Sequence, residues 1–424
     1  MNRKGMAVTL TANTMLAAAG AMTAAPAQPA APAAFELPTP TGRFAVGTAS
    51  WRLTDRSRPE TFAPGEFRQV EVIAWYPATP GRGATAPYLR EGLGEVRPFA
   101  KLFGAESAFD KVESVRTHAE LDAAPAAAPQ RFPVLVFSHG YTGMASSYTA
   151  LMEDLASHGY AVLSVVHPYE AGAATLADGR IVSMNSPDGT FRRGIQEVLA
   201  EWGPEDETMA AVTRATDDGE QMRLLRGYLG TLHNTGVMLR RWVDDTRLVL
   251  DHLSDQPATS AASRLAGRLD LRRIGAFGHS MGGVTSAQFC VEDARCRAGL
   301  NLDGIPQYGT MIDTPMAHPF LMVYSERPGR AGASDPIYRR SAHPYYRVDM
   351  KGTRHLEFSD MVFWGGPLRE RSALGSLPAA RAAELTALVV RQYFDQELLG
   401  RRSTLLAGAS VPPELTVRTV PPSR

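Results

Sequence analysis

The sequence has few cysteines, no excess of charge and no long hydrophobic run after its first residues. Only two of the 424 residues are cysteine, Cys290 and Cys296, which excludes a small fold held together by many disulfides. Basic and acidic residues number 44 each and no long run of one sign occurs, so nucleic acid is not expected as a partner. The absence of a later membrane span leaves at most transient contact with a lipid surface. The expected ligand is a small, largely neutral molecule; the sequence does not fix the oligomeric state.

The N-terminus differs in composition from the rest of the chain. A basic MNRK is followed by small and apolar residues and by an A-x-A pattern at Ala25 to Ala27. We therefore expect residues 1–27 to be an export signal and residues 28–41 a flexible Ala/Pro-rich spacer, so that the mature protein is periplasmic or secreted. A flexible tail without function is the alternative. In an oxidising compartment Cys290 and Cys296 could form a disulfide, and otherwise they are two small buried residues.

Residues 42–424 are expected to form a single α/β domain. Short apolar runs closed by glycine, histidine or an acid predict eight strands, at 43–53, 69–78, 133–140, 160–167, 273–280, 298–304, 319–326 and 345–352. The first two follow each other without a helix, as an antiparallel pair does. Helices with one apolar stripe are predicted over 147–159, 237–253 and 382–398. This alternation predicts a mostly parallel eight-stranded sheet with helices on both faces.

A long section at about 171–236 interrupts the alternation of strands and helices. It contains several turn-forming stretches between short helical pieces such as RRGIQEVLAEW. Insertions of this length after a strand are more often functional than idle, because loops at strand ends carry the site. We interpret this section as a cap over an active site; an exposed excursion without function is the alternative.

The stretch Gly278-His279-Ser280-Met281-Gly282 joins a predicted strand directly to a predicted helix. A turn this sharp crowds side chains against the backbone, so glycine is required two positions before and two after the serine. The turn projects the serine oxygen above the sheet, and the next backbone N–H faces the same space at a helix N-terminus. Ser280 is therefore the candidate nucleophile.

A serine nucleophile needs a base and an acid to orient that base. On sheet-based hydrolases these follow in the order serine, acid, histidine, which reduces ten histidines to His318, His343 and His355. The first two precede prolines at strand entrances, where a structural role is expected, whereas His355 follows the last predicted strand and is the expected base.

Two aspartates compete for the role of the acid. Asp303 ends an apolar strand, where a buried carboxylate has to be paired, and it is favoured. Asp335, in a Gly/Ser/Arg-rich loop beyond the next strand, remains the alternative. The backbone N–H groups of Tyr141 and Met281 are expected to form the oxyanion hole, because His139-Gly140-Tyr141 lies just past a strand. An ordinary strand-to-loop turn is the alternative interpretation of that segment.

Several separated motifs together resemble a known family. VGTASWRLTDRSRPE, RQVEVIAWYPATP, FSHGYTGMASSYTALMEDLASHGYAV, GHSMGG, GLNLDG and GTRHLEFSD, between about Gly42 and Gly400, are similar to the type II (plasma-type) platelet-activating factor acetylhydrolases and their bacterial relatives. The resemblance implies an α/β-hydrolase fold and a serine esterase that uses no metal or other cofactor. It also implies cleavage of short or oxidised acyl chains from phospholipids and related esters.

The resemblance also implies roles for individual residues. The family's nucleophile matches Ser280, its acid matches Asp303, its base matches His355, and its oxyanion donors match Tyr141 and Met281. The segment HGYTG with the helix after it also resembles polyester-degrading cutinases. A polyester hydrolase or a lipase would use the same residues, because the pocket and not the triad selects the substrate. A non-catalytic binding protein on the same fold is the remaining alternative.

Overall fold

The computed structural model describes residues 35–102, 106–128, 131–184, 190–255, 261–306, 308–370 and 372–420. The expected export signal over residues 1–27, and the expected spacer up to residue 34, lie outside the described residues. Within them, no helix is both long enough and apolar enough to cross a membrane.

The centre of the molecule is an eleven-stranded sheet in the order β13-β12-β11-β10-β9-β5-β6-β2-β1-β4-β3. Its strands are β1 (Ala45–Pro59), β2 (Phe67–Ala78), β3 (Thr85–Pro87), β4 (Arg116–Leu121), β5 (Phe132–Ser138), β6 (Ala161–Val166), β9 (Leu269–His279), β10 (Cys296–Leu302), β11 (Phe320–Ser325), β12 (Tyr345–Met350) and β13 (Leu415–Val420). The run from β12 to β6 pairs in parallel throughout, whereas β2 pairs antiparallel with both β6 and β1. The large, mostly parallel sheet is confirmed.

The expected number of eight strands was wrong. The three further strands, β3, β4 and β13, all lie at the ends of the sheet order. β3 has only three residues and ends in a proline, and β4 and β13 carry exposed residues along their length. Edge strands are half solvated, so they lack the continuous apolar run that reveals a central strand of a parallel sheet.

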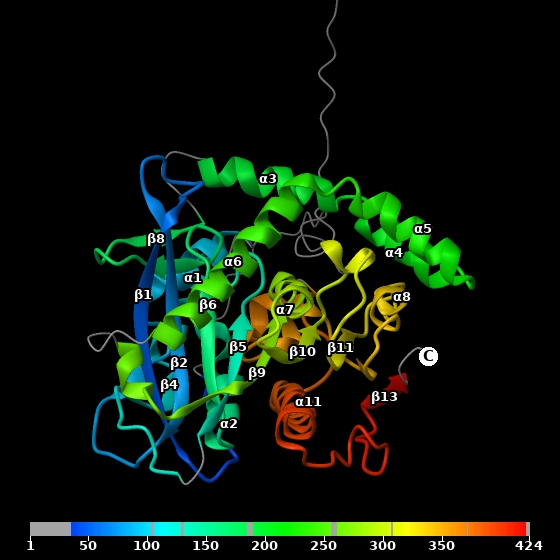
Figure 1. Ribbon diagram of the computed structural model, residues 1–424. Coiled ribbons are helices and arrows are strands. Elements are labelled where there is room, and N and C mark those ends of the chain that lie inside the picture. The colour runs from blue at the N-terminus through cyan, green and yellow to red at the C-terminus, as the bar shows by residue number, and fades with distance from the viewer. Residues whose placement is uncertain are drawn as a thin grey trace, which may run out of the picture.

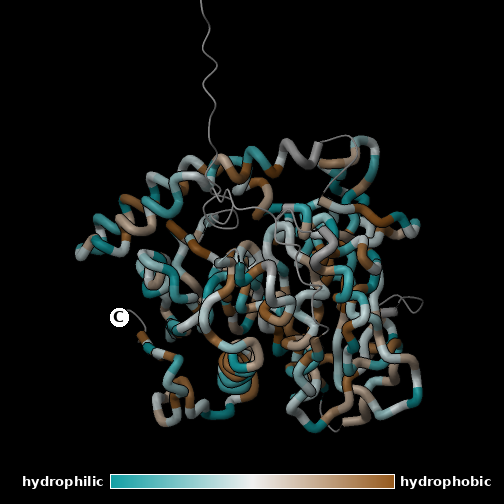
Figure 2. The backbone as a smooth tube through the Cα atoms, turned by 180° about the vertical axis from the view of Figure 1, so that it is seen from behind, coloured by the Kyte–Doolittle hydropathy of each residue, from teal (hydrophilic) through white to brown (hydrophobic). Residues whose placement is uncertain are grey.

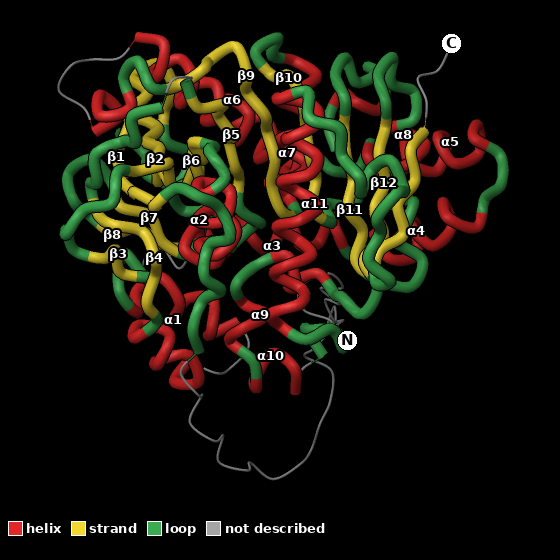
Figure 3. Tube along the Cα trace, turned by 90° about the horizontal axis from the view of Figure 1, so that it is seen from below, coloured by secondary structure: helices red, strands yellow, loops and turns green. Residues whose placement is uncertain are grey.

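Helices cover both faces of this sheet (Figures 1 and 3). They are α1 (Leu93–Leu102), α2 (Thr149–Ser157), α3 (Thr190–Trp202), α4 (Glu205–Arg214), α5 (Asp218–Leu229), α6 (His233–Asp255), α7 (Met281–Glu292), α8 (Asp335–Tyr338), α9 (Met361–Trp364), α10 (Gly366–Glu370) and α11 (Ala379–Leu399). Short 3₁₀ turns are η1 (Glu106–Ser114), η2 (Ala145–Tyr148), η3 (Ala261–Leu265), η4 (Thr310–Ile312) and η5 (His355–Phe358). Helices α2 and α11 pack on one face of the sheet, and α6 and α7 pack on the other.

The side chains of β5 show how one strand serves both faces. Leu135 and Phe137 point into the core under α2 and α11, whereas Val134 and Val136 point into the core under α6 and α7. This alternation follows from the two-residue period of a strand, and burial on both faces explains why the strand is apolar throughout. A disulfide joins Cys290 of α7 to Cys296 of β10, with an S–S distance of 1.96 Å.

The segment between β6 and α6 is mainly helical. A small hairpin of β7 (Ala173–Thr175) and β8 (Ile181–Ser183) comes first, and α3, α4 and α5 follow. The three helices lie in a row along the upper edge of the molecule in Figure 1, and Figure 2 shows hydrophobic and hydrophilic stretches alternating along them. A mostly irregular section was expected here. The polar TDDGEQ stretch resembles a turn, but Asp217 caps α5 by accepting a hydrogen bond from the Glu220 N–H at 2.9 Å.

Candidate active site

The site is organised by the sharp turn between β9 and α7. Ser280 stands at this turn with φ 56° and ψ −124°, a backbone conformation that non-glycine residues rarely adopt. A Cβ on Gly278 would lie 2.3 Å from backbone atoms of Gly282, and one on Gly282 would lie 1.9 Å from the Ser138 carbonyl oxygen. Only glycine fits at either position. The expected reason for the G-x-S-x-G spacing therefore has a direct steric basis in the structure.

Two buried backbone amides lie beside the serine. Met281 begins α7 directly after Ser280, and a Cβ on Gly140, the residue before Tyr141, would lie 3.3 Å from the Ser280 Cβ. Tyr141 and Met281 are each 2% exposed, yet in the described part of the chain neither N–H donates a hydrogen bond. Buried amides are rarely left without an acceptor. Met281 lines the same pocket as Ser280, whereas Tyr141 does not line it and is placed near the serine only through its neighbour Gly140. The expected role of both amides as an oxyanion hole stays a prediction.

Asp303 and His355 are joined by a hydrogen bond at the other side of the serine. Asp303 follows β10 and His355 begins η5 after β12, and the His355 Nδ1 lies 2.8 Å from the Asp303 Oδ2. Ser280, Asp303 and His355 line one small pocket together with Met281. All three positions lie just past the carboxyl ends of parallel strands, where an open α/β sheet places its site.

The charges around this pair favour a neutral histidine and an ionised aspartate. Burial would raise the pKa of Asp303, but the positive charge of Arg327 and the hydrogen bond from His355 lower it below its ordinary value. Burial also lowers the pKa of His355 below 6.5, against the opposing effect of Asp303. With the Nδ1 proton donated to Asp303, the free Nε2 of a neutral His355 can accept a proton from a hydroxyl.

The two candidate acids have different surroundings. Asp303 also accepts hydrogen bonds from the Ser325 N–H at 2.9 Å and from the Arg327 guanidinium at 2.8 Å. Asp335 instead accepts hydrogen bonds from the Tyr324 hydroxyl at 2.8 Å and the Tyr345 hydroxyl at 2.6 Å. The structure thus brings Asp303, and not Asp335, to His355. Arg327 was not predicted from the sequence, since nothing in a lone arginine after a strand indicates which carboxylate it will meet.

A second histidine connects the serine turn to the loop of the base. The His279 Nε2 lies 2.8 Å from the carbonyl oxygen of His355, so it carries the proton, and the His279 Nδ1 accepts a hydrogen bond from the Tyr148 hydroxyl at 2.8 Å. The same hydroxyl accepts a hydrogen bond from the Gly140 N–H at 3.3 Å. One series of hydrogen bonds therefore joins the three loops that carry Gly140, His279 and His355. Burial and the nearby His355 lower the pKa of His279 well below its ordinary value, so it stays neutral.

The loop that contains Tyr141 and Thr142 is held in place by a hydrogen bond to Glu170, whose side chain forms a buried ion pair with Arg241. The Thr142 N–H donates to the Glu170 carbonyl oxygen at 2.9 Å. The Glu170 carboxylate in turn accepts two hydrogen bonds from Arg241, at 2.9 and 2.6 Å, and one from the Trp242 indole at 2.9 Å. Bidentate pairs of this kind fix geometry as well as charge. The position of Tyr141 is thereby tied to α6.

The pocket over the serine is small and partly aromatic. Its volume is about 20 Å³, and Trp202 at the end of α3 and Tyr308 line it with parallel rings whose centroids lie 6.5 Å apart. Glu205, at the start of α4, lines the same pocket; it accepts a hydrogen bond from the Tyr308 hydroxyl at 3.0 Å and is paired with Arg330. The helices between β6 and α6 therefore supply part of the wall above Ser280. A contact between this section of the chain and the site was expected from the sequence. The sequence analysis did not identify Trp202, Glu205 or Tyr308 as the residues that make it.

The remaining histidines that follow the serine lie apart from this pocket. His318 and His343 stack on each other with ring centroids 6.2 Å apart and do not line it. The structural role expected from the prolines that follow them stays a prediction. In the described residues, His355 is thus the histidine that the fold brings to an aspartate at this site.

A large, mostly parallel sheet covered by helices on both faces, with a serine turn after one central strand, defines an α/β-hydrolase fold. A solved structure agrees with this. The ferulic acid esterase from Streptomyces cinnamoneus superposes with a TM-score of 0.67 at 28% sequence identity, over 91% of this chain and 99% of that chain.

The sequence comparisons indicate a family within this class. The profile described as platelet-activating factor acetylhydrolase, isoform II, matches residues 37–186. The platelet-activating factor acetylhydrolase of Gallus gallus is 24% identical over 56% of this chain and 55% of its own length, and that of Cavia porcellus is 26% identical over 56% and 51%. A probable 1-alkyl-2-acetylglycerophosphocholine esterase of Arthroderma benhamiae is 24% identical over 66% and 64%.

Over these segments the chain is similar to the isoform II platelet-activating factor acetylhydrolases, as its motifs predicted. It spans about half the length of the first curated relatives that it matches. The residues matched by the family profile include β5 and the Tyr141 loop but not Ser280, Asp303 or His355.

Proposed function

We propose that this chain is a serine carboxylic-ester hydrolase that works through an acyl-enzyme intermediate. The observation that supports this most strongly is the convergence of Ser280 with the hydrogen-bonded pair of Asp303 and His355 in one pocket. The relatives named acetylhydrolase and esterase support the same class of reaction.

In the proposed first step, the Ser280 Oγ attacks the ester carbonyl carbon while the His355 Nε2 accepts the hydroxyl proton. Asp303 holds the imidazolium that forms, and the N–H groups of Tyr141 and Met281 bind the oxyanion of the tetrahedral intermediate. Collapse of this intermediate breaks the bond to the alcohol, which takes its proton from His355. Water then attacks the acyl-enzyme by the same route, and the carboxylic acid and free Ser280 result.

The segment from 171 to 236 is proposed to act as the cap of a single domain that extends from 42 to 424. Trp202 and Glu205 support this role, because both line the pocket over Ser280. The acetyl group named in the relatives is the first candidate for the acyl group, because a pocket of about 20 Å³ has room for roughly one water molecule and leaves no space for a long chain. A second candidate is an ester of an aromatic acid such as ferulic acid, after which the structural neighbour is named, and the aromatic side chains of Trp202 and Tyr308 in the pocket wall support it.

The proposal is tested by labelling the protein with a fluorophosphonate and by measuring ester hydrolysis. Ser280→Ala is expected to abolish both, whereas Ser286→Ala, a matched control on α7 whose hydroxyl donates to the Gly282 carbonyl oxygen at 2.9 Å, is expected to retain both. Wild-type turnover by the Ser280 variant would contradict the assignment. Absence of labelling and of hydrolysis in the wild type would favour a binding protein.

Substrate choice is tested with a panel of esters. p-Nitrophenyl esters of rising chain length are compared with a phospholipid that carries a short second acyl chain, with ethyl ferulate and with an aliphatic polyester film. Highest kcat/KM on acetyl esters would support the acetylhydrolase-like substrate, and highest kcat/KM on ethyl ferulate would support the aromatic one. Activity concentrated on long chains or on the film would favour a lipase or a cutinase-like enzyme.

The protein is further proposed to be exported, with residues 1–27 as the signal. The disulfide between Cys290 and Cys296 supports an oxidising compartment. Mass measurement of the protein recovered from the expressing cell's exterior or periplasm is expected to give a chain that begins after Ala27. An uncleaved chain confined to the cytosol would contradict this.

A further inference from the structure

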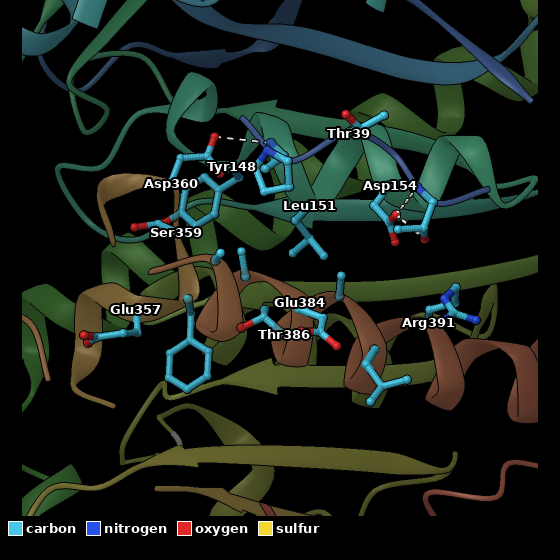
Figure 4. A pocket seen from close by; sticks show the side chains of 18 residues that line it. Thr39, Tyr148, Leu151, Asp154, Glu357, Ser359, Asp360, Glu384, Thr386 and Arg391 are labelled. Carbon is cyan, nitrogen blue, oxygen red and sulfur yellow. Dashed lines mark hydrogen bonds between the residues drawn. The ribbon is translucent and has the colours of Figure 1, made fainter. Parts of the chain in front are cut away.

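A second and larger cavity lies on the face of the sheet opposite α7. It has a volume of about 360 Å³, is open to solvent on one side, and is lined by α2, α11, η5 and the stretch from Pro38 to Thr41 (Figure 4). It shares no lining residue with the pocket that contains Ser280. Its volume falls within the range of about 300–1,000 Å³ that small-molecule sites occupy.

The walls of this cavity are largely aliphatic. They include Leu151 of α2, Phe358 of η5 and Ala383, Ala387 and Leu388 of α11. The alanines leave space between α11 and α2, because their side chains are a single methyl group. An elongated apolar body can therefore lie between the two helices.

Two of the acids that line the cavity are held by partners at its rim. Asp154 accepts hydrogen bonds from the Thr41 N–H at 2.8 Å and the Thr41 hydroxyl at 2.7 Å. Glu384 pairs with Arg381 at 2.9 Å, and its side chain is 63% exposed. Both carboxylates therefore already have hydrogen-bond donors from the protein and do not need one from a ligand.

The two acids at the inner end are also held by the protein. Glu357 accepts hydrogen bonds from the N–H groups of Arg354, at 2.7 Å, and Gly375. Asp360 accepts hydrogen bonds from the Ala150 N–H at 3.2 Å and the Tyr88 hydroxyl at 3.3 Å. Burial raises the pKa of both carboxyls to about 7, so each carries only part of its charge at neutral pH. These acids therefore add little attraction for a cationic ligand.

Arg391 is the basic residue that lines the cavity, and in the described chain no carboxylate lies within 4.0 Å of its guanidinium. Within the described residues it takes part in no ion pair, and its Nε is buried without a hydrogen-bond acceptor. Asp395, one helical turn further along, is already bound by the Tyr160 hydroxyl at 2.8 Å and by Arg401 at 3.2 Å. A half-buried guanidinium that forms no ion pair with the described chain and lines a cavity is suited to a carboxylate, which it can bind through two parallel hydrogen bonds.

We propose that this cavity binds an aliphatic carboxylate, with the carboxylate on Arg391 and the hydrocarbon chain between α2 and α11. The apolar walls account for the chain, and the unpaired guanidinium at one end accounts for the head group. The site is separate from the proposed ester hydrolase pocket, so the proposal does not depend on the catalytic activity of this chain.

The test measures binding to full-length Ser280→Ala protein by calorimetry, with decanoate, decan-1-ol and decyltrimethylammonium as probes. Decanoate is expected to bind about tenfold more tightly than the other two, because only it can make charge-assisted hydrogen bonds to Arg391. Equal affinities for the three probes, tighter binding of the ammonium, or no binding of decanoate would overturn the proposal.

Substitutions in and near the cavity test whether decanoate binds there. Arg391→Gln is expected to weaken decanoate binding about tenfold and to leave decan-1-ol within twofold. Arg402→Gln, an exposed arginine just after α11 that does not line the cavity, is the matched control and is expected to change neither. Ala387→Phe fills the space and is expected to remove binding of both probes. Decanoate binding that survives Arg391→Gln and Ala387→Phe unchanged would place the ligand elsewhere and refute the site.

Discussion

Replacing Asp303 by asparagine tests the geometry of the proposed triad most directly. The Asp303 Oδ2 accepts hydrogen bonds from the His355 Nδ1, the Ser325 hydroxyl and the Arg327 guanidinium, each at 2.8 Å. An asparagine that keeps its oxygen toward the Ser325 N–H presents an NH₂ group to these three partners. His355 then has to turn its Nδ1 into an acceptor, which moves the proton to Nε2 and removes the base that Ser280 requires.

The expected loss in kcat is about 10,000-fold, equivalent to about 5 kcal/mol of transition-state stabilisation. The assay is hydrolysis of p-nitrophenyl acetate under saturating conditions, with the thermal midpoint measured in parallel, since Arg327 also loses its counter-ion. Asp335→Asn is the matched control, because the Asp335 carboxylate is hydrogen-bonded to Tyr324 and Tyr345 and not to His355. The kcat of this variant is expected to stay within tenfold of the wild-type value. If Asp335→Asn abolishes turnover while Asp303→Asn retains it, the assignment of the acid is wrong.

Three further predictions concern the surroundings of the site. Tyr148→Phe removes the donor to His279 and is expected to lower kcat about tenfold with little change in KM; unchanged kcat would show that the connection does not position the base. The pH profile of kcat/KM is expected to fall to half at a pH below 6.5, because burial lowers the pKa of His355 and only its neutral form accepts the proton; a midpoint above 6.5 would contradict this. Glu205→Gln leaves the buried Arg330 with less compensation and is expected to lower the free energy of unfolding, measured by urea denaturation, by about 3 kcal/mol; a change under about 1 kcal/mol would show that the pair contributes little.

The sequence was most informative where local geometry restricts the choice of residue. Gly278 is required by the Gly282 backbone within the turn, and Gly282 is required by the Ser138 backbone at the end of β5. Both glycines nevertheless lie within two residues of Ser280, so the motif could be recognised from the sequence alone. The central strands could be recognised because they are buried on both faces and hence apolar throughout. The edge strands could not, because their exposed residues resemble those of loops.

The rest of the site depends on contacts between residues distant in the chain. Arg327 lies 24 residues from Asp303, and Tyr148 lies 131 residues from His279. Neither side chain carries a local signal of its partner, because an arginine or a tyrosine after a strand is compatible with many positions. The contact of Trp202 with the serine pocket likewise depends on how α3 lies over the sheet.

The different surroundings of two neighbouring histidine rings explain why only one of them is suited to proton transfer. The rings of His279 and His355 have centroids 4.5 Å apart, and both are buried. His279 makes hydrogen bonds to a carbonyl oxygen and a hydroxyl, and neither of these groups carries a negative charge that would stabilise a protonated ring. A protonated His279 would also be repelled by a protonated His355. His355 bonds to Asp303, whose negative charge stabilises the imidazolium as soon as it forms. We therefore propose His355 as the group that accepts the proton of Ser280, with His279 as a neutral neighbour that joins the two loops.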